Sequence, residues 1–194
     1  TKIYCRSSYA RSRRNVMEDV MPLFRDSLGD HKPKSTKDLI LLSCSVHEAC
    51  KLNSKWHSRL PIIHWSNVVR NKYYKCYSFS YNYINYATAI WSSPVARKLD
   101  DKTFLELRRM AICNEAPKNT ATRMISLMIK DIKKKLPKIK TLISYQDTEV
   151  HLGTIYKASN WLAIEMSDGG YGWQSRKRNK QQTAAQKIRW EYYI

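Results

Sequence analysis

The sequence predicts an α/β or α+β fold with a mixed sheet, and three observations support this. Short apolar runs typical of strands alternate with segments of helical periodicity. Residues 73–93 alternate aromatic and polar side chains in two bursts, as a β-hairpin does. Residues 121–135 place their apolar side chains on one helical face and end in a run of lysines before Pro137. The 194 residues, 43% of them hydrophobic, suffice for one domain with tails.

The first part of the chain predicts an arm followed by a strand and a helix. Residues 1–37 hold one helix-like stretch between two basic stretches, and Pro33 separates this N-terminal arm from the main domain, residues 38–194. The apolar run at 38–44 predicts a buried strand. Ser45, followed three residues later by Glu48, is a capping-box signature for a helix from about 46 to 54.

The rest of the chain predicts three more strands and one short helix. Pro61 argues against a helix through the segment 55–72, which is dense in Trp, His and Arg. The hairpin is expected to turn at about 82–85. In addition to the hairpin and the helix at 121–135, strands are predicted at 104–112, 141–145 and 187–194, and a short helix at 153–161.

The charge of the chain points to a polyanionic partner. Thirty-five Lys and Arg against 16 Asp and Glu give a net charge of +19, which costs self-repulsion unless nucleic acid is bound. The basic C-terminal segment, residues 174–194, also contains Trp190, and basic residues near aromatics suit phosphates and bases. A solvated charged tail is the alternative. The DNA-contact candidates are Arg59, Arg176, Lys177, Arg178, Lys180, Lys187 and Arg189.

The cysteine pattern and hydropathy favour a cytoplasmic protein. The five cysteines form no C-x-x-C pair, so neither a disulfide framework nor a zinc ribbon is indicated. We expect no membrane span and no signal peptide, because no apolar run is long enough.

The join between the strand at 104–112 and the following helix is a candidate anion site. A helix N-terminus offers free N–H groups and the positive end of its dipole to a phosphate. Asn119, Thr120 and Thr122 are candidates to cap that end, while Arg109 and Arg123 add charge. Many such joins bind nothing, which is the alternative, and no Walker or dinucleotide glycine motif is present.

A second candidate site follows the strand at 141–145. Asp147 lies where open α/β sheets bind ligands and can act as a general base, with Tyr145 and Tyr156 as hydrogen-bonding partners. Asp147, Glu149 and His151 alternate, so an extended segment would place them on one face as metal ligands; a solvated loop is the alternative. His57 is a further candidate acid, base or metal ligand, against a structural role.

Five segments together resemble the Mom-type DNA-modification proteins of bacteriophages, the adenine methylcarbamoylation proteins of the GNAT-like superfamily. The resemblance covers roughly residues 38–162 and implies a GNAT-like fold, an acyl-CoA or related donor, and double-stranded DNA as the substrate. The segments are WHSRLP, AIWSSPVAR, LELRRMAI, APKNTATRM and LISYQDTEVHLGTIYKASNW.

The resemblance also implies roles for individual residues. Asp147 would be the catalytic aspartate and Tyr156 the tyrosine of the GTIY element. Arg109 and Thr122 would line the donor site, and Trp56 with His57 would fill the family's His-Tyr position. The acetyltransferase signature Q/R-x-x-G-x-G/A is altered, because its defined places are filled by Ala116, Asn119 and Ala121.

Three functions remain open from the sequence. The first is transfer of an acyl or carbamoyl-type group to the exocyclic amine of adenine in DNA, which protects the DNA from host restriction. An enzyme acting on that amine is expected to flip the base, with Trp56, Trp65, Tyr145 and Tyr156 as candidates to stack on it. The second is acyl-CoA-dependent N-acetylation of another amine, on a modified base, a tRNA or a protein. The third is DNA binding without catalysis on the same scaffold.

Overall fold

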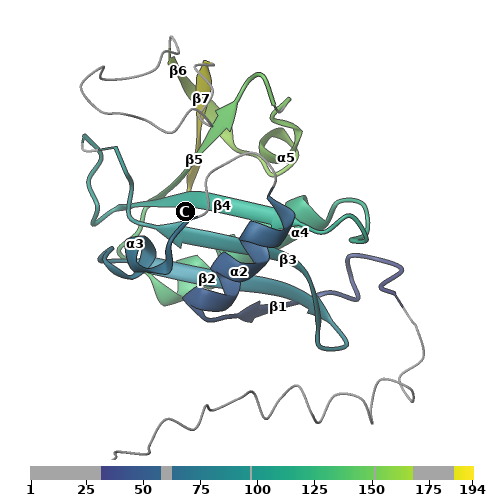
Figure 1. Cartoon of the computed structure of the whole chain (residues 1–194). Coiled ribbons are helices and arrows are strands. Elements are labelled where there is room, and N and C mark those ends of the chain that lie inside the picture. Colours follow the sequence, from purple (N-terminus) through teal and green to yellow (C-terminus); the bar gives the residue numbers. More distant parts are fainter. Residues whose placement is uncertain (1–31, 58–62, 97, 151, 168–185) are drawn as a thin grey trace, which may run out of the picture. The chain divides into compact units, whose positions relative to one another are not determined.

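The computed structural model describes residues 32–57, 63–96, 98–150, 152–167 and 186–194. Chain contacts separate Thr1–Lys32 from a compact unit, Pro33–Ile194, and the elements below belong to the latter (Figure 1). The predicted helix of the N-terminal arm lies outside the described residues. The elements are β1 (Ile40–Ser43), α2 (Val46–Trp56), α3 (Trp65–Val69), β2 (Tyr74–Tyr81), β3 (Ile84–Ser92), β4 (Phe104–Ile112), α4 (Thr120–Lys135), β5 (Thr141–Asp147), α5 (Thr154–Lys157), β6 (Leu162–Ser167) and β7 (Lys187–Tyr193).

The strands form one mixed sheet in the order β1-β2-β3-β4-β5-β7-β6. All neighbouring strands are antiparallel except β4 and β5, which are parallel and are joined through α4. A parallel connection requires a crossover, and the amphipathic α4 supplies it. The predicted α/β fold with a mixed sheet is confirmed.

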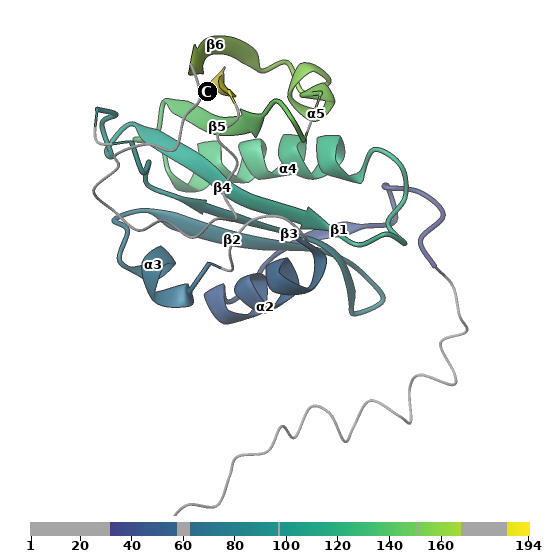
Figure 2. The same cartoon turned by 45° about the horizontal axis from the view of Figure 1, so that its top comes forward.

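Helices cover both faces of this sheet (Figure 2). On one face α4 buries Met124, Ile125, Met128 and Ile132 in the main core, which also contains aromatic side chains of β2, β3 and β7. On the other face α2 and α3 cover a smaller cluster that includes Ala49, Val68, Cys76 and Ile90. The sheet thus has an apolar layer on each side, as a central sheet requires.

Local sequence signals explain most element boundaries. The Ser45 side chain accepts a hydrogen bond of 3.1 Å from the Glu48 N–H, so the predicted N-cap of α2 is confirmed. The β2–β3 hairpin turns through Asn82 and Tyr83, whose φ angles are 46° and 63°. Two consecutive positive φ values match the twist of the flanking strands.

Two elements were not predicted. Pro61 argues against continuation of the first helix, and α2 ends at Trp56. A separate helix, α3, begins at Trp65, where the ring nitrogen of His64 accepts a 3.3 Å hydrogen bond from the Ser66 N–H and acts as the cap. β6 is an edge strand paired with β7 alone, and its side chains from Leu162 to Met166 are exposed. Such a strand has no buried face, so its sequence lacks the alternation that reveals a strand.

Within the described ranges, no helix is long and apolar enough to cross a membrane.

Candidate active site

The two parallel strands separate halfway along their length. β4 and β5 pair only at Phe104 with Thr141, Leu105 with Leu142 and Glu106 with Ile143. Beyond these pairs β4 continues to Ile112, while β5 continues to Asp147 paired with β7. The two strands therefore part toward their carboxyl ends, where α/β sheets bind ligands. We call this opening the β4–β5 split.

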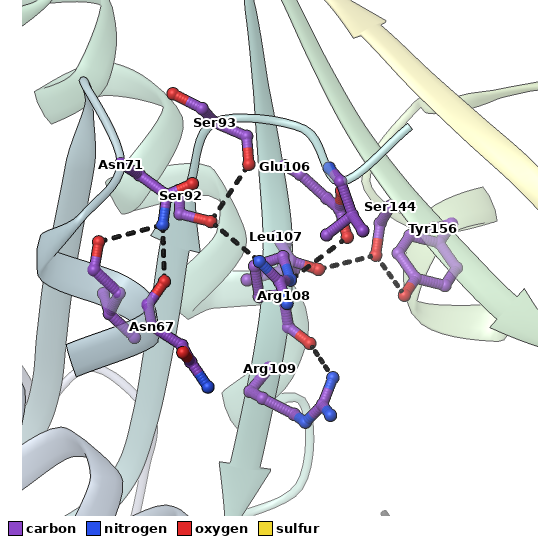
Figure 3. A network of polar contacts seen from close by, with 12 residues as sticks. Asn67, Asn71, Ser92, Ser93, Glu106, Leu107, Arg108, Arg109, Ser144 and Tyr156 are labelled. Carbon is purple, nitrogen blue, oxygen red and sulfur yellow. Dashed lines mark hydrogen bonds and ion pairs between the residues drawn. The ribbon is translucent and has the colours of Figure 1, made fainter. Parts of the chain in front are cut away.

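A buried hydroxyl pair stands at the start of the β4–β5 split (Figure 3). The Ser144 hydroxyl donates a 3.4 Å hydrogen bond to the Leu107 carbonyl on β4 and lies 2.8 Å from the Tyr156 hydroxyl on α5. Ser144 comes directly after the last ladder pair, so its side chain bridges the strands where their backbones no longer do. Burial raises the pKa of Tyr156 above its ordinary value, so its hydroxyl keeps its proton.

The ring of Tyr156 is fully used in packing. It stacks on Trp190 with centroids 5.4 Å apart and meets Trp161 edge-on at 5.6 Å, and only 8% of the residue is exposed. No open ring face remains for a nucleobase, so the expectation that Tyr156 stacks on a flipped base is wrong. Its hydroxyl, not its ring, belongs to the site.

The N-terminus of α4 differs in detail from the prediction. Asn119 occupies the N-cap but makes no side-chain capping bond, and the Thr120 hydroxyl donates to the Pro117 carbonyl at 2.6 Å. The predicted capping by these side chains is therefore wrong. Asn119 instead has φ 66°, a conformation that glycine and asparagine adopt most readily. This asparagine fills a glycine place of the acetyltransferase signature, and the backbone of the turn keeps the glycine-like conformation.

Two guanidinium groups, one on β4 and one on α4, have unused hydrogen-bonding capacity. The Nε atoms of Arg109 and Arg123 are buried without a hydrogen-bond partner. One terminal nitrogen of Arg109 donates to the Arg108 carbonyl at 2.7 Å, and burial, together with the charge of Arg108, lowers the pKa of Arg109. A buried cation with an unpaired donor is stabilised by an anion. Arg123, together with N–H groups of the first turn of α4, fits a phosphate-bearing donor. Arg109 pairs with Ile90 in the β3–β4 ladder, so its side chain lies on the other face of the sheet, which α2 and α3 cover.

Asp147 ends β5 and is partly exposed. Its Oδ1 accepts a 3.1 Å hydrogen bond from the Glu149 N–H, which orients the carboxylate. Tyr145, two residues earlier on β5, is 38% exposed, and burial and the charge of Glu106 raise the pKa of its hydroxyl. Asp147 and Tyr145 therefore lie on the same face of β5, opposite the face of Ser144.

The structure adds Glu106, which was not among the predicted site residues. It is 7% exposed, belongs to the last β4–β5 pair, and accepts a 2.9 Å hydrogen bond from the Val95 N–H. Its other oxygen lies 3.5 Å from Nε of Arg108, which also donates to the Ser92 hydroxyl (Figure 3). Burial raises the pKa of Glu106, and the Val95 N–H and both arginines partly offset that effect. A charged residue within an apolar strand was the available signal.

The remaining predicted residues are not gathered at the β4–β5 split. His57 caps the C-terminus of α2, and its N–H donates to the Asn53 carbonyl at 2.8 Å. Arg189, a predicted DNA contact, pairs with Glu165 at 2.6 Å and with Glu191 at 3.0 Å, so its charge is neutralised locally. Lys187 faces Asp147 in the β5–β7 register.

Part of the prediction cannot be placed. Arg59, His151, Arg176, Lys177, Arg178 and Lys180 lie outside the described residues. In the part that is described, no group of three or more His, Cys, Asp or Glu side chains is arranged to hold a metal ion.

Solved structures with the same arrangement are acetyltransferases. The ribosomal-protein-S18-alanine N-acetyltransferase of Escherichia coli has a TM-score of 0.58 at 12% identity, over 80% of this chain and 94% of that chain. A GNAT family acetyltransferase of Elizabethkingia anophelis with acetyl-CoA bound has a TM-score of 0.57 at 10% identity, over 81% and 99%. A Bacillus subtilis acetyltransferase in complex with CoA has a TM-score of 0.58 at 10% identity, over 80% and 99%.

The sequence itself identifies the family. No curated protein matches it. The model of the Mom protein family matches residues 64–191, which is more than half of the chain and spans α3 through most of β7. The chain therefore belongs to the Mom protein family and has the fold of the GNAT acetyltransferases.

Proposed function

We propose that this protein transfers an acyl or carbamoyl-type group from a phosphate-bearing donor to the exocyclic amine of adenine in DNA. The observation that carries the proposal is the β4–β5 split, because β4 leads from it to the N-terminus of α4, where Arg123 has a buried Nε atom without a partner. The match to the Mom family and the net charge of +19 support DNA as the acceptor.

The donor fits the residues present at the N-terminus of α4. The backbone N–H groups of Ala121 and Thr122 and the guanidinium of Arg123 would hold its phosphates. Solved acetyltransferases of the same fold are complexes with acetyl-CoA or CoA, which supports a thioester of that kind. The positive φ of Asn119 preserves the turn despite the missing glycine.

The chemistry requires one group that removes a proton and one that supplies a proton. The amine of adenine is a weak nucleophile because its lone pair is delocalised, so proton removal must accompany its attack on the donor carbonyl. The carboxylate of Asp147 accepts that proton as the C–N bond forms. With a thioester donor, the C–S bond breaks and the departing sulfur takes a proton from the Tyr156 hydroxyl, which Ser144 holds at 2.8 Å. Backbone N–H groups stabilise the charge on the carbonyl oxygen.

We include protection of DNA from restriction endonucleases in the proposal, because it follows from modification of the base. A modified adenine presents an altered base edge to a restriction endonuclease, which reads hydrogen-bonding groups in the major groove. The protein would act on bacteriophage DNA in the cytoplasm of the infected host.

Protection from cleavage tests this setting. Plasmid from cells that express the wild-type protein is digested with endonucleases whose sites contain adenine, and with others whose sites hold only G and C. We expect resistance at the first kind alone, and none with Asp147→Asn. Equal cleavage of plasmid from expressing and non-expressing cells contradicts the proposal.

The second candidate is N-acetylation of another amine, on a modified base, a tRNA or a protein, and the acetyl-CoA and CoA complexes among similar structures favour it. To separate the two candidate functions, the pure protein is incubated with radioactive acetyl-CoA and, in separate reactions, with DNA, with tRNA and with protein fractions. Label in tRNA or protein alone supports the second candidate. If Asp147→Asn leaves every cellular effect intact, the protein binds DNA without catalysis.

A further inference from the structure

A cluster of three aromatic rings lies exposed at the junction of α2 and α3, outside the β4–β5 split. The ring of Trp65 is 4.8 Å from that of His47 and 5.3 Å from that of His64, with interplanar angles of 35° and 36°. Both histidines are exposed, and 40% of Trp65 is accessible to solvent. The packing of α2 against α3 therefore builds an aromatic surface that faces water.

This ring cluster is held in place. Nδ1 of His64 lies 2.7 Å from the Ser66 hydroxyl and accepts a hydrogen bond from the Ser66 N–H, which caps α3. The ring orientation therefore depends on the helix cap as well as on stacking. A large aromatic side chain kept at the surface in this way indicates a binding surface, because burial would be favoured otherwise.

Basic side chains flank the rings. Lys51 and Lys55 follow His47 at intervals of four residues along α2, so they continue the same helical face, and both are exposed. Arg70, at the C-terminus of α3, is also exposed. The acidic residue of α2, Glu48, is turned away from this face and accepts a 3.0 Å hydrogen bond from the Asn85 side chain.

We propose that the aromatic-basic surface formed by His47, Lys51, Lys55, His64, Trp65 and Arg70 binds single-stranded nucleic acid. An unpaired base stacks on the ring cluster, and the neighbouring phosphates lie along the two lysines and Arg70. Exposed rings beside a row of cations form the combination that binds single strands without sequence preference. Charge complementarity favours this occupant over a protein partner. This proposal builds on the proposed function, because it says where the DNA strand from which adenine is flipped would lie. Binding of a single strand to this surface does not itself require group transfer.

The test uses the full-length protein and a fluorescent oligothymidylate, which contains no adenine and so cannot be an acceptor. Binding is followed by anisotropy at several salt concentrations. We expect Trp65→Ala to bind about tenfold or more weakly, whereas Trp65→Phe keeps most of the affinity. Tyr193→Ala is the matched control, since Tyr193 is 58% exposed on β7, a strand that β4 and β5 separate from β2 and β3, and should bind as wild type.

A second variant tests the basic row independently of the rings. Lys51→Gln with Lys55→Gln removes two phosphate contacts, so the slope of log affinity against log salt should become shallower by about 1.4. Wild-type affinity in Trp65→Ala, or an equal loss in Tyr193→Ala, overturns the proposal. If Trp65→Ala fails to fold, an unchanged salt slope in the lysine variant overturns it in the same way. Loss of DNA modification with normal oligothymidylate binding contradicts the transfer proposal alone.

Discussion

At the scale of single residues, the Ser144 hydroxyl replaces a missing backbone connection. It joins the Leu107 carbonyl of β4 to the Tyr156 hydroxyl of α5 where the strand pairing ends. All parts of this bridge are buried, so each polar atom depends on its partner. The pair therefore fixes both the start of the β4–β5 split and the position of the proposed proton donor.

A double-mutant cycle measures this bridge. Ser144→Ala leaves the buried Tyr156 hydroxyl without its partner, and we expect a loss of about 1–3 kcal/mol in the free energy of unfolding. Tyr156→Phe alone should also destabilise, and the double variant should cost clearly less than the sum, because both polar groups are then gone. Denaturant unfolding gives all values, with the exposed Ser126→Ala as control. Strict additivity contradicts the bridge.

Glu106 gives a pH-dependent signature. Because its pKa is higher in the folded chain than its ordinary value of 4.5, the folded protein holds this proton more readily than the unfolded one. Its contribution to stability is therefore greatest at low pH, and it falls as the pH rises from about 4.5 through the raised folded pKa. The difference in unfolding free energy between wild type and Glu106→Gln should decrease over that window. A flat difference over that window contradicts the assignment.

Gly153 is constrained by packing as well as by its backbone. Its φ is 70°, and a Cβ there would lie 2.9 Å from a ring carbon of Trp190 and would also clash with Oε1 of Gln146, the acceptor of the Trp190 N–H. Gly153→Ala should therefore cost about 1–3 kcal/mol from overpacking, in addition to the left-handed strain. Asn160→Ala, also at positive φ but exposed, carries the strain alone. Equal losses in the two variants, measured by thermal unfolding, rule out the packing component.

At the scale of elements, the sequence predicted those helices and turns that interactions between residues close in the chain determine. The hairpin around Asn82 and the amphipathic α4 follow from turn chemistry and periodicity, and both are confirmed. The β4–β5 split was not predictable in this way, because it depends on β5 leaving β4 for β7, a strand about 45 residues later in the chain. Glu106 and Ser144 were missed for the same reason. Their roles arise from the point at which two strands separate, which no spacing in the sequence records.

The proposed donor site at the N-terminus of α4 can be tested directly. Arg109→Met and Arg123→Met keep much of the side-chain volume but remove the guanidiniums whose Nε atoms are unpaired. We expect Arg123→Met to weaken CoA binding at least about tenfold, since charge-assisted hydrogen bonds contribute about 1.5–3 kcal/mol. Arg109→Met, on the face of the sheet opposite α4, should weaken it less. Isothermal titration calorimetry measures this, with Lys130→Met on the exposed face of α4 as control. Affinity unchanged in both arginine variants contradicts the donor site.

At the scale of the whole molecule, the fold and the charge carry different information. The fold provides the β4–β5 split and the helix N-terminus beside it, and many proteins of unrelated substrate share these features. The charge of +19 is one ground for proposing DNA as the acceptor. The aromatic-basic surface on α2 and α3 is the part of the described structure where we propose that nucleic acid binds. The resemblance to a known family selected Asp147 and Tyr156. The structure places Asp147 at the end of β5 and Tyr156 on α5, beside the start of the β4–β5 split. The roles of the basic residues between β6 and β7 stay predictions.

The central claim is that a group is transferred to adenine in DNA by a site that uses Asp147. DNA from cells expressing the wild-type protein or Asp147→Asn is digested to nucleosides, and the accurate mass of each nucleoside is measured. We expect an adenine nucleoside of increased mass with wild type, absent with Asp147→Asn, while the other nucleosides are unchanged. Unmodified adenine under full expression of a folded, DNA-binding wild-type protein would contradict it.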